Sequence, residues 1–302
     1  MSPPPASAPT LEPRPSLWRR LTRGVRRLRQ QGDWASFAGE DWPERILGEV
    51  VTDRLHRKQG RSIARWTLQG DGRRLVVYLK RHYRLPWWRG LLATLFPRRA
   101  WSPGLQEWEH LIWAAGQGLP VPRAVAAGEW VGPWGRLRSF LAVEELAGML
   151  PLHEAVPRAH ASLAPSEFAR WKQGLVAEMA RITRELHGRR VFHKDLYLCH
   201  FYVPESVISN VPDDWRGGVC LIDLHRLARH RWTFPWWQVK DLAQLLYSSE
   251  VPGVTARDRL RFWRLYRGGA GTGGAWARFL RWCVRLKWRR YRGHNRKRKP
   301  TW

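Results

Sequence analysis

Four acidic and basic residues in the sequence have the types and the order that transfer of a phosphoryl group requires. Lys80 ends an apolar run, and Asp195 and Asp223 each follow a later apolar run. A lysine can hold phosphate oxygens, one carboxylate can accept the proton of an attacking hydroxyl, and another can bind Mg²⁺. Glu107 is the natural ion-pair partner for Lys80, with Glu109 as the competing choice. Because this reaction needs little covalent chemistry from a protein, positioning and charge neutralisation are enough to support it.

The spacing of these residues resembles the catalytic motifs of protein kinases. His193 and Asp195 match the first and third residues of H-R-D-x-x-x-x-N, in which the aspartate is the base. His200 stands where that motif has a metal-binding asparagine. Leu221–Arg226 resembles the D-F-G region, and Val77–Lys80 resembles the strand-borne V-A-I-K. Each motif alone is weak evidence, but together they occur in the order that the kinase scaffold requires.

The loop around Asp195 resembles a more specific family. Asp195 is followed by Cys199 and His200, as in the lipopolysaccharide core kinases, which include the inner-core heptose kinases and the Kdo kinases. Further similar segments are Gln106–Leu111, Gly118–Pro122, Ala126–Glu129 and Val239–Leu245, so that the resemblance covers roughly 45–250. It implies an α+β, two-lobed protein-kinase-like fold, ATP and Mg²⁺, and a sugar hydroxyl of the lipopolysaccharide inner core as acceptor.

The resemblance also implies a role for each matching residue. Asp195 would be the general base, and His193, Lys80 and Glu107 the other catalytic residues. Asp223 would bind Mg²⁺. For His200 two roles stay open, ligand of Mg²⁺ or partner of Asp223 or of a phosphate oxygen. Both remain because neutral imidazole competes poorly with oxygen ligands for Mg²⁺.

Two further segments would contact the nucleotide. Lys58, Gly60 and Arg61 belong to a turn whose backbone N–H groups could hold phosphate, helped by the two basic side chains. Glu145–Leu146 ends a strand and leads into the helical half of the chain. It is either the hinge whose backbone pairs with adenine or an ordinary exit from a strand. Asp241 corresponds to the buried aspartate that braces the kinase catalytic loop.

Apolar and β-branched runs predict a mostly antiparallel sheet in the first half of the chain. The expected strands are Ile46–Arg54, Ser62–Leu68, Leu75–Lys80, Val125–Glu129 and Leu137–Glu145. A helix is expected over Leu105–Gln117, and residues 81–103 are expected to be irregular. These elements would form the N-lobe.

Helical spacing dominates from about residue 148. A long helix is expected between an N-cap at Ser166 and a C-cap at Gly188, and another over Lys240–Ser249. Val191–Val203 and Val219–Leu224 are apolar runs that resemble strands. These elements would form the C-lobe.

Both ends of the chain are expected to lie outside the two lobes. Residues 1–16 resemble a disordered tail. Residues 17–29 place apolar side chains on one face of a helix and arginines on the other, which suits an anionic membrane surface or packing on the protein's own domain. The expected organisation is a tail with an amphipathic segment at 1–35, an N-lobe at 36–147, a C-lobe at 148–284 and a basic tail at 285–302.

The net charge of +28 indicates a polyanionic partner. Nucleic acid, an anionic membrane face and a phosphorylated substrate all fit, as does a merely solvated basic surface. Only 17 residues lie between Asp223 and Asp241, too few for the peptide-binding segment of a protein kinase. A small or glycan acceptor is therefore favoured. An anionic glycolipid at the inner leaflet would also suit the basic surface, whereas nucleic acid is a less favoured partner.

Other properties set the location and the alternatives. The sequence has no run of about 18 uncharged apolar residues, and its three cysteines lack metal-ligand spacing. We expect a cytoplasmic protein, peripheral on the inner face of the membrane. The alternatives are another small-molecule phosphotransferase or a protein kinase on the same fold, and a non-catalytic kinase-like scaffold that binds membrane or nucleic acid.

Overall fold

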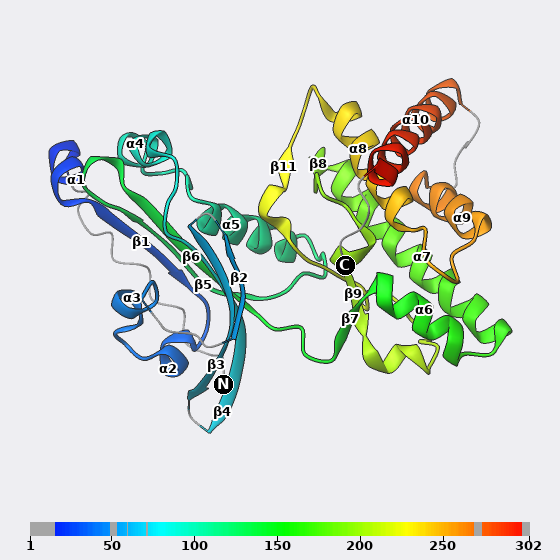
Figure 1. Cartoon of the computed structure of the whole chain (residues 1–302), viewed down its shortest axis with the longest axis horizontal. Helices are drawn as coiled ribbons and strands as arrows, with labels where there is room; N and C mark the ends of the chain where they lie inside the picture. Colours follow the sequence, from blue (N-terminus) through cyan, green and yellow to red (C-terminus); the bar gives the residue numbers. More distant parts are fainter. Residues whose placement is uncertain (1–15, 49–52, 59, 71, 269–273, 298–302) are drawn as a thin grey trace, which may run out of the picture.

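The N-lobe is built on one antiparallel sheet. The computed structural model describes residues 16–48, 53–58, 60–70, 72–268 and 274–297 (Figure 1). Six strands lie in the order β1-β5-β6-β4-β3-β2. Their bounds are β1 Val25–Gln30, β2 Asp53–Lys58, β3 Arg61–Gly70, β4 Arg73–His82, β5 Ala124–Val131 and β6 Leu137–Glu144.

Five α-helices and one 3-10 turn accompany this sheet in the described part of the N-lobe. They are α1 (Leu17–Arg23), α2 (Trp34–Ala38), α3 (Trp42–Arg45), α4 (Trp87–Leu95), the long α5 (Pro103–Gly116) and the 3-10 turn η1 (Pro133–Gly135). Trp34 and Trp42 from α2 and α3 pack edge-on and reach Phe140 of β6, forming an aromatic core on one face. Figure 1 shows α5 between the sheet and the C-lobe. It is one of the elements through which the two lobes meet.

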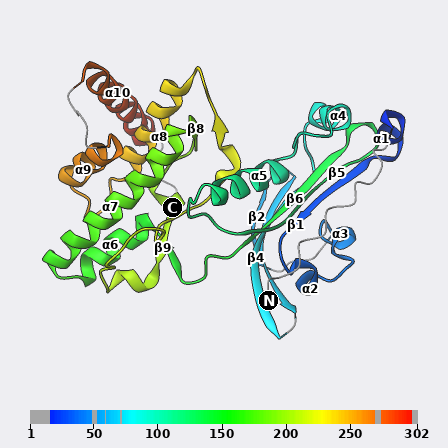
Figure 2. The ribbon, with the colours of Figure 1, turned by 180° about the vertical axis from the view of Figure 1, so that it is seen from behind.

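The C-lobe is mainly helical. Its helices are α6 (Leu152–Ser162), α7 (Pro165–Gly188), α8 (Phe234–Ser248), α9 (Ala256–Tyr266) and α10 (Ala275–Lys297). Short strands and 3-10 turns complete it, namely β7 (Met149–Pro151), β8 (Val191–Phe192), η2 (Leu198–His200), β9 (Phe201–Pro204), η3 (Glu205–Ile208), β10 (Cys220–Leu221), η4 (Leu224–Arg226) and β11 (Ala228–Arg229). Both lobes are also seen from behind in Figure 2. The α+β class and the two-lobed arrangement are thus as predicted.

The central helix α7 follows its sequence pattern closely. Side chains spaced three or four apart along it are buried, because they form one face that packs into the C-lobe core. Its N-cap is Ala164 rather than the predicted Ser166. The Glu167 carboxylate accepts a hydrogen bond from the Ala164 N–H at 3.2 Å, which satisfies one free amide at the helix start.

The predicted helix over residues 17–29 is wrong beyond Arg23. Gly24 takes a φ of +77°, and Val25–Gln30 then form β1, which pairs with β5. Arg27 of this strand donates to the Glu129 carboxylate, which is fully buried. A buried carboxylate needs a charged partner, so tertiary contacts outweigh the helical spacing. The N-lobe sheet consequently begins at residue 25, not at 36.

Three other expectations need correction. Of the strand expected over Ile46–Arg54, Ile46 instead packs in the core just after α3, residues 49–52 lie outside the described residues, and Asp53 and Arg54 belong to β2. Residues 81–103 are not irregular throughout, because β4 continues to His82 and α4 follows. The basic tail is not a separate segment from residue 285, since α10 runs through that boundary and buries Leu280 and Val284 in the C-lobe.

Replacing Arg27 with methionine should destabilise the N-lobe. The variant leaves the buried Glu129 carboxylate without its cation, a loss of about 3–5 kcal/mol when one partner of a buried pair is removed. Thermal unfolding of the R27M variant should show a clearly lower midpoint. The double variant R27M/E129L should recover much of that loss. Unfolding of R27M at the wild-type midpoint would show that the pair does not stabilise β1.

Candidate active site

A single buried carboxylate holds the loop that carries Asp195. Asp241, on α8, is fully buried and accepts hydrogen bonds from the backbone N–H groups of His193 and Lys194 at 2.9 and 2.8 Å. It also contacts His187 Nε2 at 3.3 Å. Lys194 takes a φ of +67°, an unfavourable conformation for a residue with a side chain. The charge-assisted bonds to Asp241 fix this turn, as the resemblance to kinases implied.

His193 is a positioning residue rather than a catalytic one. Its side chain is fully buried, and Nε2 donates to the carbonyl of Ile222 at 3.0 Å. Burial lowers the pKa of the imidazole, which favours the neutral form. The ring therefore ties the Asp195 loop to the segment that carries Asp223. Its place among the predicted catalytic residues is corrected accordingly.

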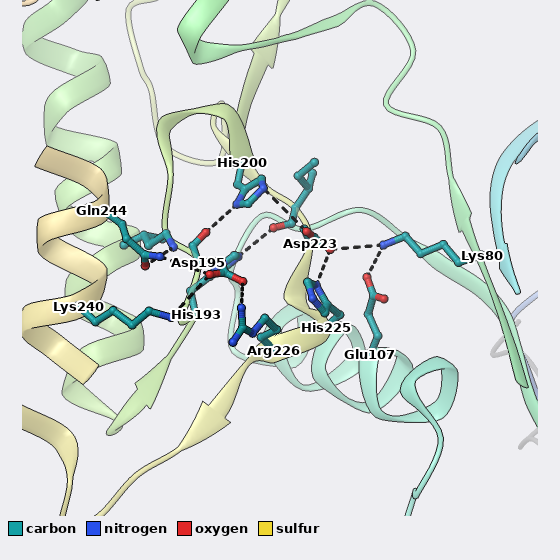
Figure 3. Close-up of polar contacts among 12 residues, drawn as sticks. Lys80, Glu107, His193, Asp195, His200, Asp223, His225, Arg226, Lys240 and Gln244 are labelled. Carbon is teal, nitrogen blue, oxygen red and sulfur yellow. Dashed lines mark hydrogen bonds and ion pairs between the residues drawn. The ribbon is translucent and has the colours of Figure 1, made fainter. Parts of the chain in front are cut away.

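Asp195 lies among cationic and amide donors. Arg226 Nη1 donates to its carboxylate at 2.7 Å, and Gln244 Nε2 donates at 3.3 Å. Lys240 Nζ lies 3.7 Å from Asp195 Oδ1 (Figure 3). The sequence reasoning did not identify Arg226, Lys240 or Gln244 as site residues. A signal existed for the last two, because they flank the bracing Asp241 on one helix.

Lys80 and Glu107 of the N-lobe meet Asp223 of the C-lobe. Lys80 Nζ lies 2.6 Å from Glu107 Oε1 and 3.7 Å from Asp223 Oδ1. Glu107 is buried on α5, whose first turn is capped by the Ser102 hydroxyl. Glu109 lines a different hollow, together with Arg27. The geometry thus brings Lys80 to Glu107 and not to Glu109.

Asp223 is held in an ionised state. Burial by itself raises the pKa of this carboxyl group, but the hydrogen bond from His225 Nδ1 at 2.7 Å and the charge of Lys80 hold the pKa well below its usual range. Its φ of +63° turns the backbone so that the 3-10 turn η4 follows directly. His225 was also missed by the sequence reasoning, although it lies only two residues after Asp223.

His200 connects the two aspartates. Its Nδ1 donates to the backbone carbonyl of Asp195 at 2.7 Å, and its Nε2 lies 3.8 Å from Asp223 Oδ2. Burial lowers the pKa of the imidazole, but Cys199, the Asp195 carbonyl and the Asp223 carboxylate outweigh it, so the pKa is raised overall. A proton on Nε2 would allow a direct attraction to Asp223.

The donor set fits Mg²⁺ that is held jointly with phosphate oxygens. Mg²⁺ in nucleotide sites usually takes one or two protein carboxylates, the remaining ligands being phosphate and water. Asp223 supplies an ionised carboxylate next to Lys80. The described part of the chain holds no cluster of three or more His, Cys, Asp or Glu side chains able to ligate a metal. Asp223 is therefore the residue that would hold the ion, with His200 as its neighbour.

The structure agrees only partly with the expected adenine hinge. The N–H of Glu145 donates to the carbonyl of Val76 at 2.8 Å, and its carboxylate binds Arg65 at 2.6 and 2.8 Å. The Glu145 N–H is therefore not available for adenine. The carbonyl of Leu146 accepts from the Met149 N–H at 3.2 Å. Any hydrogen bond from this segment to adenine must therefore come from backbone groups other than these two.

The expected phosphate-binding turn joins β2 to β3. Gly60 has a φ of +77°, and its carbonyl accepts from the Tyr83 N–H at 2.7 Å. In the register of β3 and β4, Arg61 lies opposite His82. Ile63, two residues further along β3, lies opposite Lys80. The Nε of Arg61 is buried and has no hydrogen-bond partner within the described residues. The side chain of Lys58 and all of Gln59 lie outside the described residues.

Comparisons with known proteins match this arrangement. The model of the lipopolysaccharide kinase (Kdo/WaaP) family matches residues 50–266. The lipopolysaccharide core heptose(I) kinase WaaP of Pseudomonas aeruginosa is 32% identical over 220 residues, covering 72% of this chain and 78% of the relative. The protein of the same name from Escherichia coli K12 is 31% identical over 165 residues, covering 54% of this chain and 59% of the relative.

A solved structure supports the same assignment. The structure titled "WaaP in complex with acyl carrier protein" superposes with a TM-score of 0.65 and 28% identity, covering 86% of this chain and 97% of that one. The two-lobed fold is thus that of a known kinase. Since the family model spans both lobes and all the site residues described above, the chain belongs to the lipopolysaccharide kinase (Kdo/WaaP) family.

Proposed function

We propose that this protein transfers the γ-phosphoryl group of ATP to a sugar hydroxyl of the lipopolysaccharide inner core. The observation that carries the proposal is the meeting of Lys80, paired with Glu107, and the ionised Asp223 between the lobes. Kinase catalysis requires both of these elements in place. The named relatives are heptose kinases of the same core structure, which supports a sugar hydroxyl as acceptor.

Each side chain has a distinct task in this reaction. Asp195 accepts the proton of the attacking hydroxyl, and Lys80 holds phosphate oxygens of ATP. Asp223 holds Mg²⁺, which when bound neutralises charge on the phosphates. His200 orients Asp223 through its Nε2, because its Nδ1 is occupied by the Asp195 carbonyl. Arg61, with a buried and unpartnered Nε in the described chain, is suited to bind a phosphate oxygen.

The surroundings of Asp195 favour an anionic acceptor. Arg226 and Lys240, which belong to two different elements, η4 and α8, both approach its carboxylate. Lys194 and Lys240 also lie against the Trp237 ring, at 4.8 and 5.5 Å. A neutral acceptor would not need this concentration of positive charge, whereas the acidic sugars and phosphates of an inner-core glycolipid would be attracted to it.

The site of action would be the inner face of the cytoplasmic membrane. The net charge of +28 suits an anionic lipid surface. In the described chain, every helix is either too short or too polar to cross a bilayer. Peripheral attachment of a cytoplasmic enzyme agrees with both observations.

An acyl carrier protein is a second proposed partner. An apolar cavity of about 430 Å³ lies between α7, α8, α9 and α10 of the C-lobe. Leu175, Met179 and Leu246 are among its lining residues, and Arg281 and Arg285 of α10 also line it. An acyl chain would fill the apolar part, and the arginines would attract the phosphate of the carrier's prosthetic arm. The solved relative with an acyl carrier protein supports this proposal.

Asp195→Asn should reduce turnover by about 10²-fold or more, the effect of losing a positioned base. The assay is ³²P transfer from ATP into lipopolysaccharide that lacks inner-core phosphate, followed by identification of the labelled sugar. Asp213 is an exposed aspartate between η3 and β10, and Asp213→Asn is the matched control that should retain full activity. Label in protein rather than glycolipid would favour a protein kinase, and no transfer by the wild type would favour a non-catalytic scaffold.

Glu107→Gln should lower kcat/KM for ATP roughly tenfold or more, because Lys80 loses the carboxylate that positions it. Glu109→Gln, two residues further along the same helix, should change this value little. Both variants are compared by steady-state kinetics with varied ATP. A larger effect at Glu109 would contradict the assignment of the Lys80 partner.

Filling the C-lobe cavity should abolish the difference in affinity between acyl-loaded and unloaded acyl carrier protein. The wild type should bind a hexadecanoyl-loaded carrier at least tenfold more tightly than the unloaded carrier, since burial of each methylene contributes about 0.8 kcal/mol. Val176→Trp, a substitution within the cavity lining, should bind the two forms equally. Isothermal titration gives both affinities, and equal binding by the wild type would rule out an acyl pocket.

A further inference from the structure

An aromatic patch on the C-lobe is exposed to solvent. Trp276, Phe279 and Trp282 of α10 carry large exposed rings. The ring centres of Trp276 and Phe279 lie 5.8 Å apart, and those of Phe279 and Trp282 lie 6.0 Å apart. Trp282, at the end of this row, is 59% exposed. We define the C-lobe patch as Trp236, Trp276, Phe279, Trp282 and Leu286. Exposed apolar surface of this kind usually marks an interaction site.

Packing of α10 on its own lobe does not explain these rings. Ala277, Leu280 and Val284 form a different face of the helix and are buried in the C-lobe. The helix is therefore held by one apolar face and presents a second one to solvent. A shallow groove runs along the second face, where Pro235 and Val239 of α8 meet Phe279 and Leu286.

The charge of α10 indicates what would cover this face. Between residues 275 and 293 the helix has no acidic residue, and its basic residues are Arg278, Arg281, Arg285, Lys287, Arg289, Arg290 and Arg292. Lys287 Nζ lies 4.2 Å from the centre of the Trp236 ring. Aromatic side chains flanked by arginine and lysine are typical of helices that lie in the interface of an anionic bilayer.

A second patch of exposed aromatic residues lies on the N-lobe. We define the N-lobe patch as Trp18 of α1, Trp87, Trp88 and Phe96 in and after α4, and Trp134 of η1, which is 74% exposed. The three elements pack together. Arg20 of α1 donates to the Thr94 carbonyl of α4 at 2.8 Å, and Gly90 of α4 lies so close to Gly135 that no side chain fits there.

The two patches are carried by elements on one edge of the molecule. Figure 1 shows α1 and α4 at the top of the N-lobe and α8 and α10 at the top of the C-lobe, and Figure 2 shows the same edge from behind. The edge is connected to the active site, because Trp236 lies one helical turn before Lys240, whose Nζ is 3.7 Å from Asp195 Oδ1.

We propose that the N-lobe patch and the C-lobe patch dock together on one anionic bilayer. The proposal rests on the proposed function in that the acceptor is taken to be a membrane glycolipid. Two contacts on separate lobes set the orientation of the enzyme, whereas a single contact leaves it free to rotate. The site where Lys80 lies near Asp223 is thereby held in one orientation to the lipid surface. Of the predicted amphipathic segment at 17–29, only α1 takes part.

Vesicle flotation tests the proposal with two triple variants. The W276S/F279S/W282S variant alters the C-lobe patch, and W18S/W87S/W134S alters the N-lobe patch. With vesicles of phosphatidylethanolamine and phosphatidylglycerol at low salt, each should lower the partition coefficient about tenfold, and the combined variant about 100-fold, because the contacts act on one surface. Neutral phosphatidylcholine vesicles should bind the wild type weakly.

A matched control separates these patches from general charge. Arg261→Gln, Arg264→Gln and Leu265→Ser together remove two charges and one exposed apolar residue from α9, outside both patches. This variant should bind vesicles as the wild type does. Hydrogen exchange of the unmodified protein is a second measurement, and vesicles should protect peptides from α1, α4 and α10. That result does not depend on the folding of any variant.

The outcomes distinguish this proposal from the proposed function. All three patch variants should phosphorylate detergent-dispersed acceptor at the wild-type rate, because no catalytic residue is changed. Wild-type vesicle binding by the combined variant, or an effect confined to one patch, would overturn two-patch docking while leaving the kinase assignment intact. Patch-dependent binding of single-stranded DNA without binding of vesicles would also overturn it. Absence of phosphoryl transfer by the wild type would instead refute the proposed function.

Discussion

The active site depends on the hydrogen bonds that the buried Asp241 carboxylate accepts from the backbone. The chain must leave β8, turn through an unfavourable backbone conformation at Lys194 and bring Asp195 to Arg226 and Gln244. Two charge-assisted hydrogen bonds from backbone N–H groups hold that turn. A charge inside the protein is tolerated only when such donors surround it. The same helix then supplies Lys240 and Gln244 to Asp195, so α8 fixes both the loop and the charge around the Asp195 carboxylate.

Electrostatic contacts also join the lobes. Lys80 extends from the N-lobe sheet and lies near Asp223 of the C-lobe, while Glu107 on α5 fixes its position. His110, one turn further along α5, hydrogen-bonds the Leu224 carbonyl at 2.8 Å. The segment that carries Asp223 is therefore held from α5, from Lys80 and from His193. Any relative movement of the lobes would change these contacts together, because they converge on a few neighbouring residues.

Positive charge has different consequences in different places. Around Asp195 it is concentrated by Arg226 and Lys240 and suits an anionic acceptor. Along α10 it lies beside exposed tryptophans, where both the aromatic rings and the arginines favour a lipid interface. In β1 it is directed inward, since Arg27 neutralises the buried Glu129. The net charge alone could not separate these uses, because it contains no information on position.

The sequence by itself determined the order of the chemistry-bearing residues and most of the principal strands and helices, because these follow from local periodicity and from short motifs. The two-lobed fold was implied by the resemblance of those motifs to the lipopolysaccharide core kinases. Only the tertiary structure decided that Glu107, rather than Glu109, pairs with Lys80, since both lie on one helix and its rotation is set by packing. It also placed Val25–Gln30 in the sheet, buried His193 and brought Arg226 and His225 to the aspartates. Each of these depends on contacts between segments distant in sequence, whose energy no local pattern contains.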